Sequence, residues 1–181
     1  MTLLSPQDKK TRPITDRVKE SLFNILRNDL PDALVADLFC GTGSLGLEAL
    51  SRGAQRVIFA DCDSENIRRL RQNITRLRFE PQCLAVRADV LKTAIPCVVS
   101  EKNPFGLIFV DPPYRLSRET QLESKLDRLL VKLAEQLADR GLVVVRHEKS
   151  SELLTQYASL HLQQRREYGS MAITFLEKNR G

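Results

Sequence analysis

Positions 111–114 read Asp-Pro-Pro-Tyr and follow directly on an apolar run, "GLIFV". The two prolines stiffen the chain and remove two backbone donors. What remains is a corner rich in acceptors, formed by the Asp111 carboxylate and the Pro112 carbonyl, with the ring of Tyr114 beside them. Such a corner suits an exocyclic amine on a flat base, because the amine offers two N–H donors and the base can stack on the ring.

An exocyclic amine is a poor nucleophile, since its lone pair is delocalised into the ring of the base. Hydrogen bonds from its two N–H groups to Asp111 and to the Pro112 carbonyl would hold the nitrogen in a more pyramidal geometry. They would also stabilise the positive charge that develops as the nitrogen attacks a sulfonium methyl group. This chemistry requires neither a metal nor a covalent nucleophile, and we predict no metal site.

Three glycines, Gly41, Gly43 and Gly46, follow another apolar run in the spacing G-x-G-x-x-G. A glycine-rich turn between a strand and a helix lets backbone N–H groups approach an anion, either a pyrophosphate or the carboxylate of a bound amino acid. Asp61 lies twenty positions after Gly41, where an acid can bind the ribose hydroxyls of an adenosine. The spacing alone is therefore compatible with a dinucleotide or with S-adenosylmethionine.

Asp37 favours S-adenosylmethionine as the cofactor. This acid lies inside an apolar strand, four residues before Gly41. Because burying an unpaired charge costs several kcal/mol, we expect Asp37 to have a cationic or donor partner. A dinucleotide has no ammonium to offer, whereas the methionyl part of S-adenosylmethionine has one. Asp89, at the end of the third strand, is placed to accept a hydrogen bond from the adenine amino group.

Strands alternate with helices along the chain. Strands are expected at 33–39, 56–61, 83–89, 106–111 and 142–148, and helices at 15–26, 44–53, 64–78 and 119–141, with a short helical piece between about 90 and 100. The first helix has Thr15 or Asp16 as its N-cap. This alternation predicts βαβ units and a mostly parallel sheet with helices on both faces.

The last segment, 160–178, differs because it predicts two strands around a turn at 168–170. The expected architecture is therefore an α/β, Rossmann-like sheet of seven strands that ends in an antiparallel hairpin. Such sheets bind ligands at the carboxyl ends of the strands, where the strand order reverses.

The chain has 181 residues, of which 42% are hydrophobic and 28% charged, and its formal net charge is +5. This length predicts a single domain over 1–181, in which 1–30 form an extension and a helix packed on the catalytic core. The basic balance favours an anionic partner, nucleic acid first. No run is long enough to span a membrane and the N-terminus lacks the apolar core of a secretion signal, so we expect a cytoplasmic protein.

The four cysteines, Cys40, Cys62, Cys83 and Cys97, are far apart and form no C-x-x-C pair. Zinc spacing is therefore absent, and we expect reduced and partly buried thiols.

Three blocks, "TRPITDRVKESLFNIL", "DLFCGTGSLGLEALSRGA" and "FVDPPY", resemble in this order the RsmD family of bacterial guanine-N2 methyltransferases. The first block is the family-specific element, and the other two are shared with many methyltransferases. The resemblance implies a class I S-adenosylmethionine-dependent methyltransferase that acts on the N2 amine of a guanine in 16S ribosomal RNA. In the family, a partly assembled small ribosomal subunit presents the target, and we expect the enzyme to be a monomer.

The resemblance also implies roles for individual positions. Asp111, Pro112 and Tyr114 would form the amine site. The cofactor would contact the first strand with its glycine loop, the end of the second strand and the end of the third. The residues that this implies are Asp37, Phe39, Gly41, Gly43, Asp61, Cys62 and Asp89. The substrate RNA would be approached by Arg12, Thr15, Asp16, Arg17 and Pro113.

The chain departs from the family pattern at the N-terminus. Family members usually begin with a short basic β-hairpin, whereas eleven residues precede Arg12 here. The basic residues Lys9, Lys10, Arg12 and Arg17 are candidates to grip RNA in its place.

Three other functions are compatible with parts of this pattern. The same corner serves N-methyltransferases that act on adenine in DNA or RNA, or on a protein amide, although the lack of a separate target-recognition domain counts against DNA. A C5-pyrimidine methyltransferase would use Cys40 as its nucleophile, a poor position inside the cofactor loop. A non-catalytic RNA-binding module would not need the complete set of acids.

Overall fold

The computed structural model describes residues 14–93, 95 and 104–180. These residues contain eight strands, which are β1 (Leu34–Leu38), β2 (Arg56–Asp61), β3 (Cys83–Arg87), β4 (Phe105–Val110), β5 (Leu137–Glu148), β6 (Gln156–Tyr157), β7 (Leu160–Tyr168) and β8 (Met171–Lys178). The α-helices are α1 (Asp16–Ile25), α2 (Ser44–Ser51), α3 (Ser64–Leu77), α4 (Tyr114–Ser117) and α5 (Lys125–Gln136), and short 3₁₀ turns lie at Leu26–Asn28 and Glu80–Gln82.

All eight strands form one sheet in the order β3-β2-β1-β4-β5-β8-β7-β6. The first five strands in this order are parallel, and β8, β7 and β6 are joined to them by antiparallel pairing. The order reverses between β1 and β4, so the carboxyl ends of these two strands form the crevice at which sheets of this kind bind ligands. The mostly parallel α/β sheet with its C-terminal antiparallel hairpin confirms the predicted fold class.

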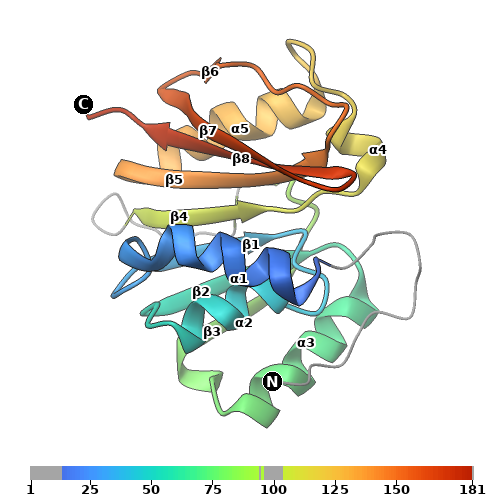
Figure 1. Ribbon diagram of the computed structural model, residues 1–181. Helices are drawn as coiled ribbons and strands as arrows, with labels where there is room; N and C mark the ends of the chain where they lie inside the picture. Colours follow the sequence, from blue (N-terminus) through green and yellow to red (C-terminus); the bar gives the residue numbers. More distant parts are fainter. Residues whose placement is uncertain (1–13, 94, 96–103, 181) are drawn as a thin grey trace.

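Two hydrophobic clusters lie on opposite faces of this sheet. One joins α1, α2 and α3 to the strands, with the Phe23 and Phe109 rings 5.8 Å apart. The other packs α5 against the opposite face through Leu126, Leu130 and Leu133. Figure 1 shows this arrangement, with α1 in front of the central strands and α5 behind the upper ones.

Local sequence explains how these helices begin. The Thr15 side chain accepts a hydrogen bond from the Val18 amide at 3.4 Å, so Thr15, one of the two predicted candidates, is the N-cap of α1. Asp63 caps α3 in the same way by accepting from Glu65 and Asn66. At Gly46 a Cβ atom would lie 2.3 Å from the Phe59 ring, so only glycine lets α2 approach β2 this closely.

Two expectations about the elements were wrong. The sheet has eight strands because the short β6 pairs with β7, and two residues leave no pattern in the sequence. The helix expected over 119–141 covers Lys125–Gln136, since Leu137 already pairs with Phe105 in the sheet. Leu137 continues the leucine spacing of the helix. However, the pairing of β5 with β4 is irregular between Leu137 and Leu142, so the residues between them belong to the strand.

The helical piece expected after position 89 falls partly outside the described residues, which show turns at 90–92. Within the described ranges, none of the helices is long and apolar enough to cross a membrane.

Candidate functional site

The three acids Asp37, Asp61 and Asp111 gather at the carboxyl ends of the neighbouring strands β1, β2 and β4. Side chains alternate between the faces of a strand, and each acid follows by two positions a residue of the core cluster under α1, α2 and α3, namely Val35, Phe59 and Phe109. All three carboxylates are therefore on the same face of the sheet, at the reversal of the strand order.

The glycine loop that follows β1 is held by two of these carboxylates. Asp61 accepts a hydrogen bond from the Gly41 amide at 2.8 Å, and Asp37 accepts one from the Gly46 amide at 2.8 Å. Gly41 and Gly43 have φ angles of 54° and 84°, in the left-handed region that glycine adopts without strain. Phe39 also has a positive φ, of 56°, so the chain turns sharply as soon as it leaves the strand.

Asp37 is 1% exposed, and its donor partner is the backbone N–H of Gly46. Burial raises its pKa well above the usual range, the Gly46 N–H acts in the opposite direction, and the nearby Asp111 and Asp61 carboxylates raise the pKa further. A cation bound against Asp37 would favour the ionised carboxylate. The site therefore has the acceptor chemistry that an ammonium group requires.

Asp61 and Asp89 differ in burial and in their hydrogen-bond partners. Asp61 is 8% exposed and also accepts from the Asp63 amide at 2.9 Å. The Asp89 side chain is 37% exposed, accepts from the Leu91 amide and makes a 3.1 Å ion pair with Lys92. Cys62, between them in the chain, is exposed. Asp61, Cys62 and Asp89 lie at or just after the ends of β2 and β3 as predicted, and their cofactor contacts stay predictions.

The Asp-Pro-Pro-Tyr corner follows β4 directly, and its first residue, Asp111, remains hydrogen-bonded to the sheet. The Asp111 amide donates to the Leu38 carbonyl at 3.2 Å, Pro112 is buried and Pro113 is exposed at the start of α4. Tyr114 opens that helix, and its hydroxyl is buried with no hydrogen-bond partner among the described residues. A buried hydroxyl with unused capacity is suited to a ligand contact.

Arg146 was not among the residues predicted for the site; it is 7% exposed, and its Nε donates a hydrogen bond to the Asp111 carboxylate at 2.5 Å. Val110 pairs with Val145 in neighbouring strands, so the residues that follow them lie side by side. One signal was present in the sequence: an arginine within the apolar run "LVVVRHE" needs a partner for the same reason that Asp37 does. Burial raises the pKa of Asp111, and Arg146 acts to lower it.

If Asp111 is the predicted acceptor for the amine, loss of the Arg146 charge should move the acid limb of the pH–rate profile of methyl transfer. Asp111 would accept hydrogen bonds best as a carboxylate, so the rate should fall when the pH drops through the pKa of Asp111. In Arg146→Met that pKa rises further, and the acid limb of the kcat profile is expected at higher pH than in the wild type. The profile of Arg146→Lys, which keeps the charge, should lie between the two. An acid limb of Arg146→Met that stays in place would show that Asp111 does not titrate in catalysis.

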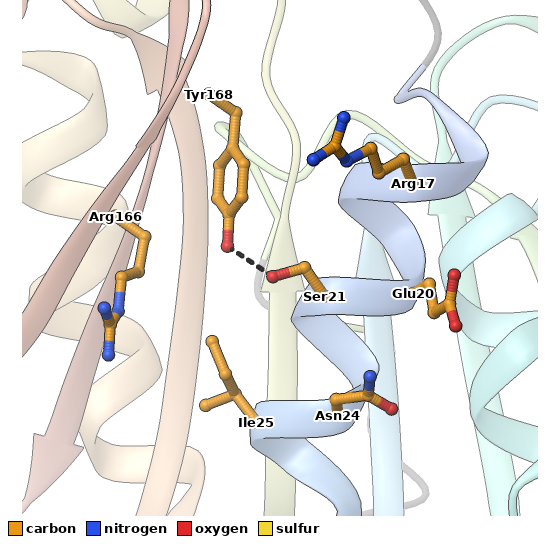
Figure 2. A pocket seen from close by; sticks show the side chains of 7 residues that line it. All are labelled: Arg17, Glu20, Ser21, Asn24, Ile25, Arg166 and Tyr168. Carbon is orange, nitrogen blue, oxygen red and sulfur yellow. Dashed lines mark hydrogen bonds between the residues drawn. The ribbon is translucent and has the colours of Figure 1, made fainter.

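Of the residues expected to meet RNA, Pro113 lies in this corner, and Thr15, Asp16 and Arg17 lie at the start of α1. Thr15 caps α1, and Asp16 and Arg17 are exposed in its first turn. Arg17 lines a groove with Arg166 and Tyr168 of β7, which Figure 2 shows from close by. Arg12 lies outside the described residues. Those residues contain no group of three or more His, Cys, Asp or Glu side chains that could hold a metal ion.

The sheet order and the acids at its reversal define a class I methyltransferase architecture. The solved structure of the methyltransferase yhhF from Escherichia coli superposes with a TM-score of 0.75 and 31% sequence identity, covering 97% of this chain and 92% of that one. A hypothetical protein of Thermus thermophilus gives a TM-score of 0.74 at 27% identity, covering 98% of this chain and 93% of the other.

The family follows from comparisons of sequence. The family model described as "Conserved hypothetical protein 95" matches residues 1–177. Ribosomal RNA small subunit methyltransferase D of Escherichia coli is 33% identical over 174 residues, which are 96% of this chain and 82% of the relative. The Haemophilus influenzae protein of the same name is 33% identical over 147 residues, 80% of this chain and 72% of that protein. The chain therefore belongs to the RsmD family, which confirms the resemblance.

Proposed function

We propose that this protein transfers a methyl group to the exocyclic N2 amine of a guanine in 16S ribosomal RNA. Its family makes it an S-adenosylmethionine-dependent methyltransferase of small-subunit ribosomal RNA, as the sequence predicted, and the N2 atom is the finer proposal. The observation that carries this proposal is the corner at the end of β4. There Asp111, held by Arg146, lies next to the Pro112 carbonyl and Tyr114.

The residues at the glycine loop fit the cofactor. S-adenosylmethionine supplies an electrophilic methyl group on a sulfonium, and its amino-acid end carries an ammonium and a carboxylate. Asp37 would receive the ammonium, and the left-handed turn at Gly41 and Gly43 leaves backbone amides free of Cβ crowding for the carboxylate. Asp61 would take the ribose, because a carboxylate that accepts backbone amides still has lone pairs for hydroxyl donors.

With the cofactor bound, the amine nitrogen would gain the methyl group as the carbon–sulfur bond breaks, and the bonding electrons would stay on sulfur, which leaves as a neutral thioether. Asp111 and the Pro112 carbonyl accept hydrogen bonds from the two N–H groups of the amine and stabilise the positive charge on the nitrogen until it loses a proton to solvent. Arg146 orients the Asp111 carboxylate and favours its ionised form against the effect of burial. Tyr114 stacks on the base once the base has left its neighbours.

No observation favours a C5-pyrimidine methyltransferase. Cys40 is buried, and burial raises its pKa well above the usual range, with Asp37 and Asp61 adding to the effect. A thiol must ionise to act as a nucleophile, so this environment opposes the role.

The finer proposals concern the oligomeric state and location of the enzyme and the form in which its RNA target is presented. We propose that residues 1–181 act as one domain and as a monomer, in the cytoplasm, on a target that a partly assembled small subunit presents. Sedimentation of the purified protein tests the monomer, and a comparison of substrates tests the form of the target.

The deciding experiment is a tritiated methyl-transfer assay with three substrates: naked 16S RNA, small ribosomal subunits and DNA. The expected result is label in N2-methylguanosine after nucleoside digestion of the RNA, with DNA unlabelled. Asp111→Ala serves as the catalytic control. Label recovered in methyladenosine, or in protein, would contradict the assignment to guanine N2.

A further inference from the structure

A groove of about 500 Å³ separates α1 from β7, and its lining includes one arginine from each wall. Its lining combines one side of the helix with the end of the hairpin strand, which gives Arg17, Glu20, Ser21, Asn24, Ile25, Arg166 and Tyr168. In Figure 2 the Arg17 guanidinium extends toward Tyr168 from the helix, and Arg166 lies on the other side of Tyr168, along the strand. Glu20 points away from the space between them, so the charge inside the groove is positive.

The two arginines keep their charge available. Both are exposed, and no ion pair involves either of them within the part of the chain that the structure describes. The contrast with the next residue is direct, because Arg165 pairs with Glu167 and Glu167 also pairs with Lys149. Arg166 has only a 3.3 Å hydrogen bond from its Nε to Gln164 among those residues. Its remaining N–H donors can bind an anion.

The groove belongs to the same face and the same edge of the sheet as the catalytic corner. Arg146 pairs with Ile173, and Ile173 pairs with Arg166, so these three residues form one cross-strand row that begins beside Asp111. Three strand spacings, from β4 across β5 and β8 to β7, separate Asp111 from Arg166, a distance of about 14 Å. A polymer with its reactive base at Asp111 therefore reaches the groove with nucleotides next to the target.

One hydrogen bond ties the two walls of the groove together. The Ser21 and Tyr168 hydroxyls are 2.9 Å apart and join α1 to the hairpin across 147 positions of the chain. Tyr168 also packs against the core cluster beneath α1. The distance between the arginine-bearing walls is thereby fixed before any ligand arrives, a preorganisation that lowers the entropic cost of binding.

We propose that this groove binds the phosphate backbone of the RNA strand that flanks the target guanine. This inference rests on the proposed function and adds the surface through which the protein contacts its RNA. Arg17 and Arg166 neutralise neighbouring phosphates, and the Asn24 side-chain amide supplies a further donor at the lower end of the groove (Figure 2). Guanidinium groups suit phosphate oxygens because their planar fork donates two parallel hydrogen bonds. The contacts carry no sequence information and set the orientation of the strand.

The test measures RNA affinity against salt concentration for the double variant Arg17→Gln/Arg166→Gln. Each phosphate contact to a single strand contributes about 0.7 to the slope of log K against log salt, so loss of two should flatten the slope by about 1.4. The affinity at about 0.15 M salt should fall about tenfold or more. The matched control is Arg128→Gln, an exposed arginine on α5 at the opposite face, which should match the wild type.

Three results separate the possibilities, with S-adenosylmethionine affinity measured for every variant. A flatter slope in the double variant alone, with cofactor affinity unchanged, supports the groove. A slope equal to that of Arg128→Gln overturns the groove while the wild type still methylates RNA, so the proposed function survives. Normal binding of naked RNA with activity lost only on ribosomal particles would also overturn it, because the groove would then contact a protein.

Discussion

The Asp111→Ala variant is expected to lose methyl transfer by about two to three orders of magnitude while its affinity for S-adenosylmethionine stays within about threefold. The loss follows from the removal of an acceptor aimed at the charge that develops on the amine, an interaction stronger in the transition state than in the ground state. Asp111→Asn keeps one acceptor oxygen and should lose less. Single-turnover methyl transfer and calorimetric titration of the cofactor provide the two measurements.

Arg146 complicates the interpretation of Asp111→Ala. The alanine leaves a guanidinium that is 7% exposed without the Asp111 carboxylate, and breaking a buried ion pair by removing one partner destabilises a protein by about 3–5 kcal/mol. The double variant Asp111→Ala/Arg146→Met removes both charges and should recover part of the stability without recovering activity. If the double variant regains methyl transfer, Asp111 serves only to neutralise the arginine, and the proposed mechanism is wrong.

The second large effect is expected at the cofactor site. Asp37→Asn keeps the shape of the side chain and an oxygen for the Gly46 amide, so it changes little except the charge. A hydrogen bond to a charged group contributes about 1.5–3 kcal/mol, which corresponds to a roughly 10- to 100-fold weaker affinity for S-adenosylmethionine. Calorimetry measures this change, and circular dichroism of the variant verifies that it is folded.

The pH dependence gives Asp37 a distinct signature. The cofactor's ammonium interacts with the ionised carboxylate, so affinity is high above the pKa of Asp37 and is lost as the pH falls through it. Because burial raises that pKa, the loss begins at higher pH than for an ordinary aspartate. In Asp37→Asn this component of the pH dependence should be absent. A variant that binds the cofactor as tightly as the wild type at every pH would refute the ammonium contact.

Local patterns in the sequence predicted most of the fold. The apolar runs, the glycine spacing and the acids that end the strands each lie within a few neighbouring residues, so their consequences can be derived without knowing the pairing of strands. The five parallel strands and the final hairpin all overlap the segments where the pattern expects them, although β5 begins at Leu137, five residues earlier than expected. Patterns failed at Leu137, where helical spacing continued into a residue that pairs with Phe105 in the sheet. There tertiary pairing overrides local propensity.

The same distinction between local pattern and tertiary pairing applies to the residues of the candidate site. Asp37, Asp61 and Asp111 could be found by type and position, because burying an acid in or beside an apolar strand is unfavourable unless the acid has a partner. Arg146 could have been suspected on that ground, but its partner could not be named, since 34 residues separate it from Asp111 in the sequence. Only the register of β4 against β5 makes them neighbours.

By itself, then, the sequence determined the class of fold and the cofactor and pointed to the acceptors proposed to face an amine, because these depend on residue types at short spacing. The tertiary structure decided which charges meet. It placed Arg146 against Asp111, joined Ser21 to Tyr168, and brought Arg17 and Arg166 to the two walls of one groove. The physical reason is that strand register and helix packing are set by burial of the whole core, and no short segment encodes them.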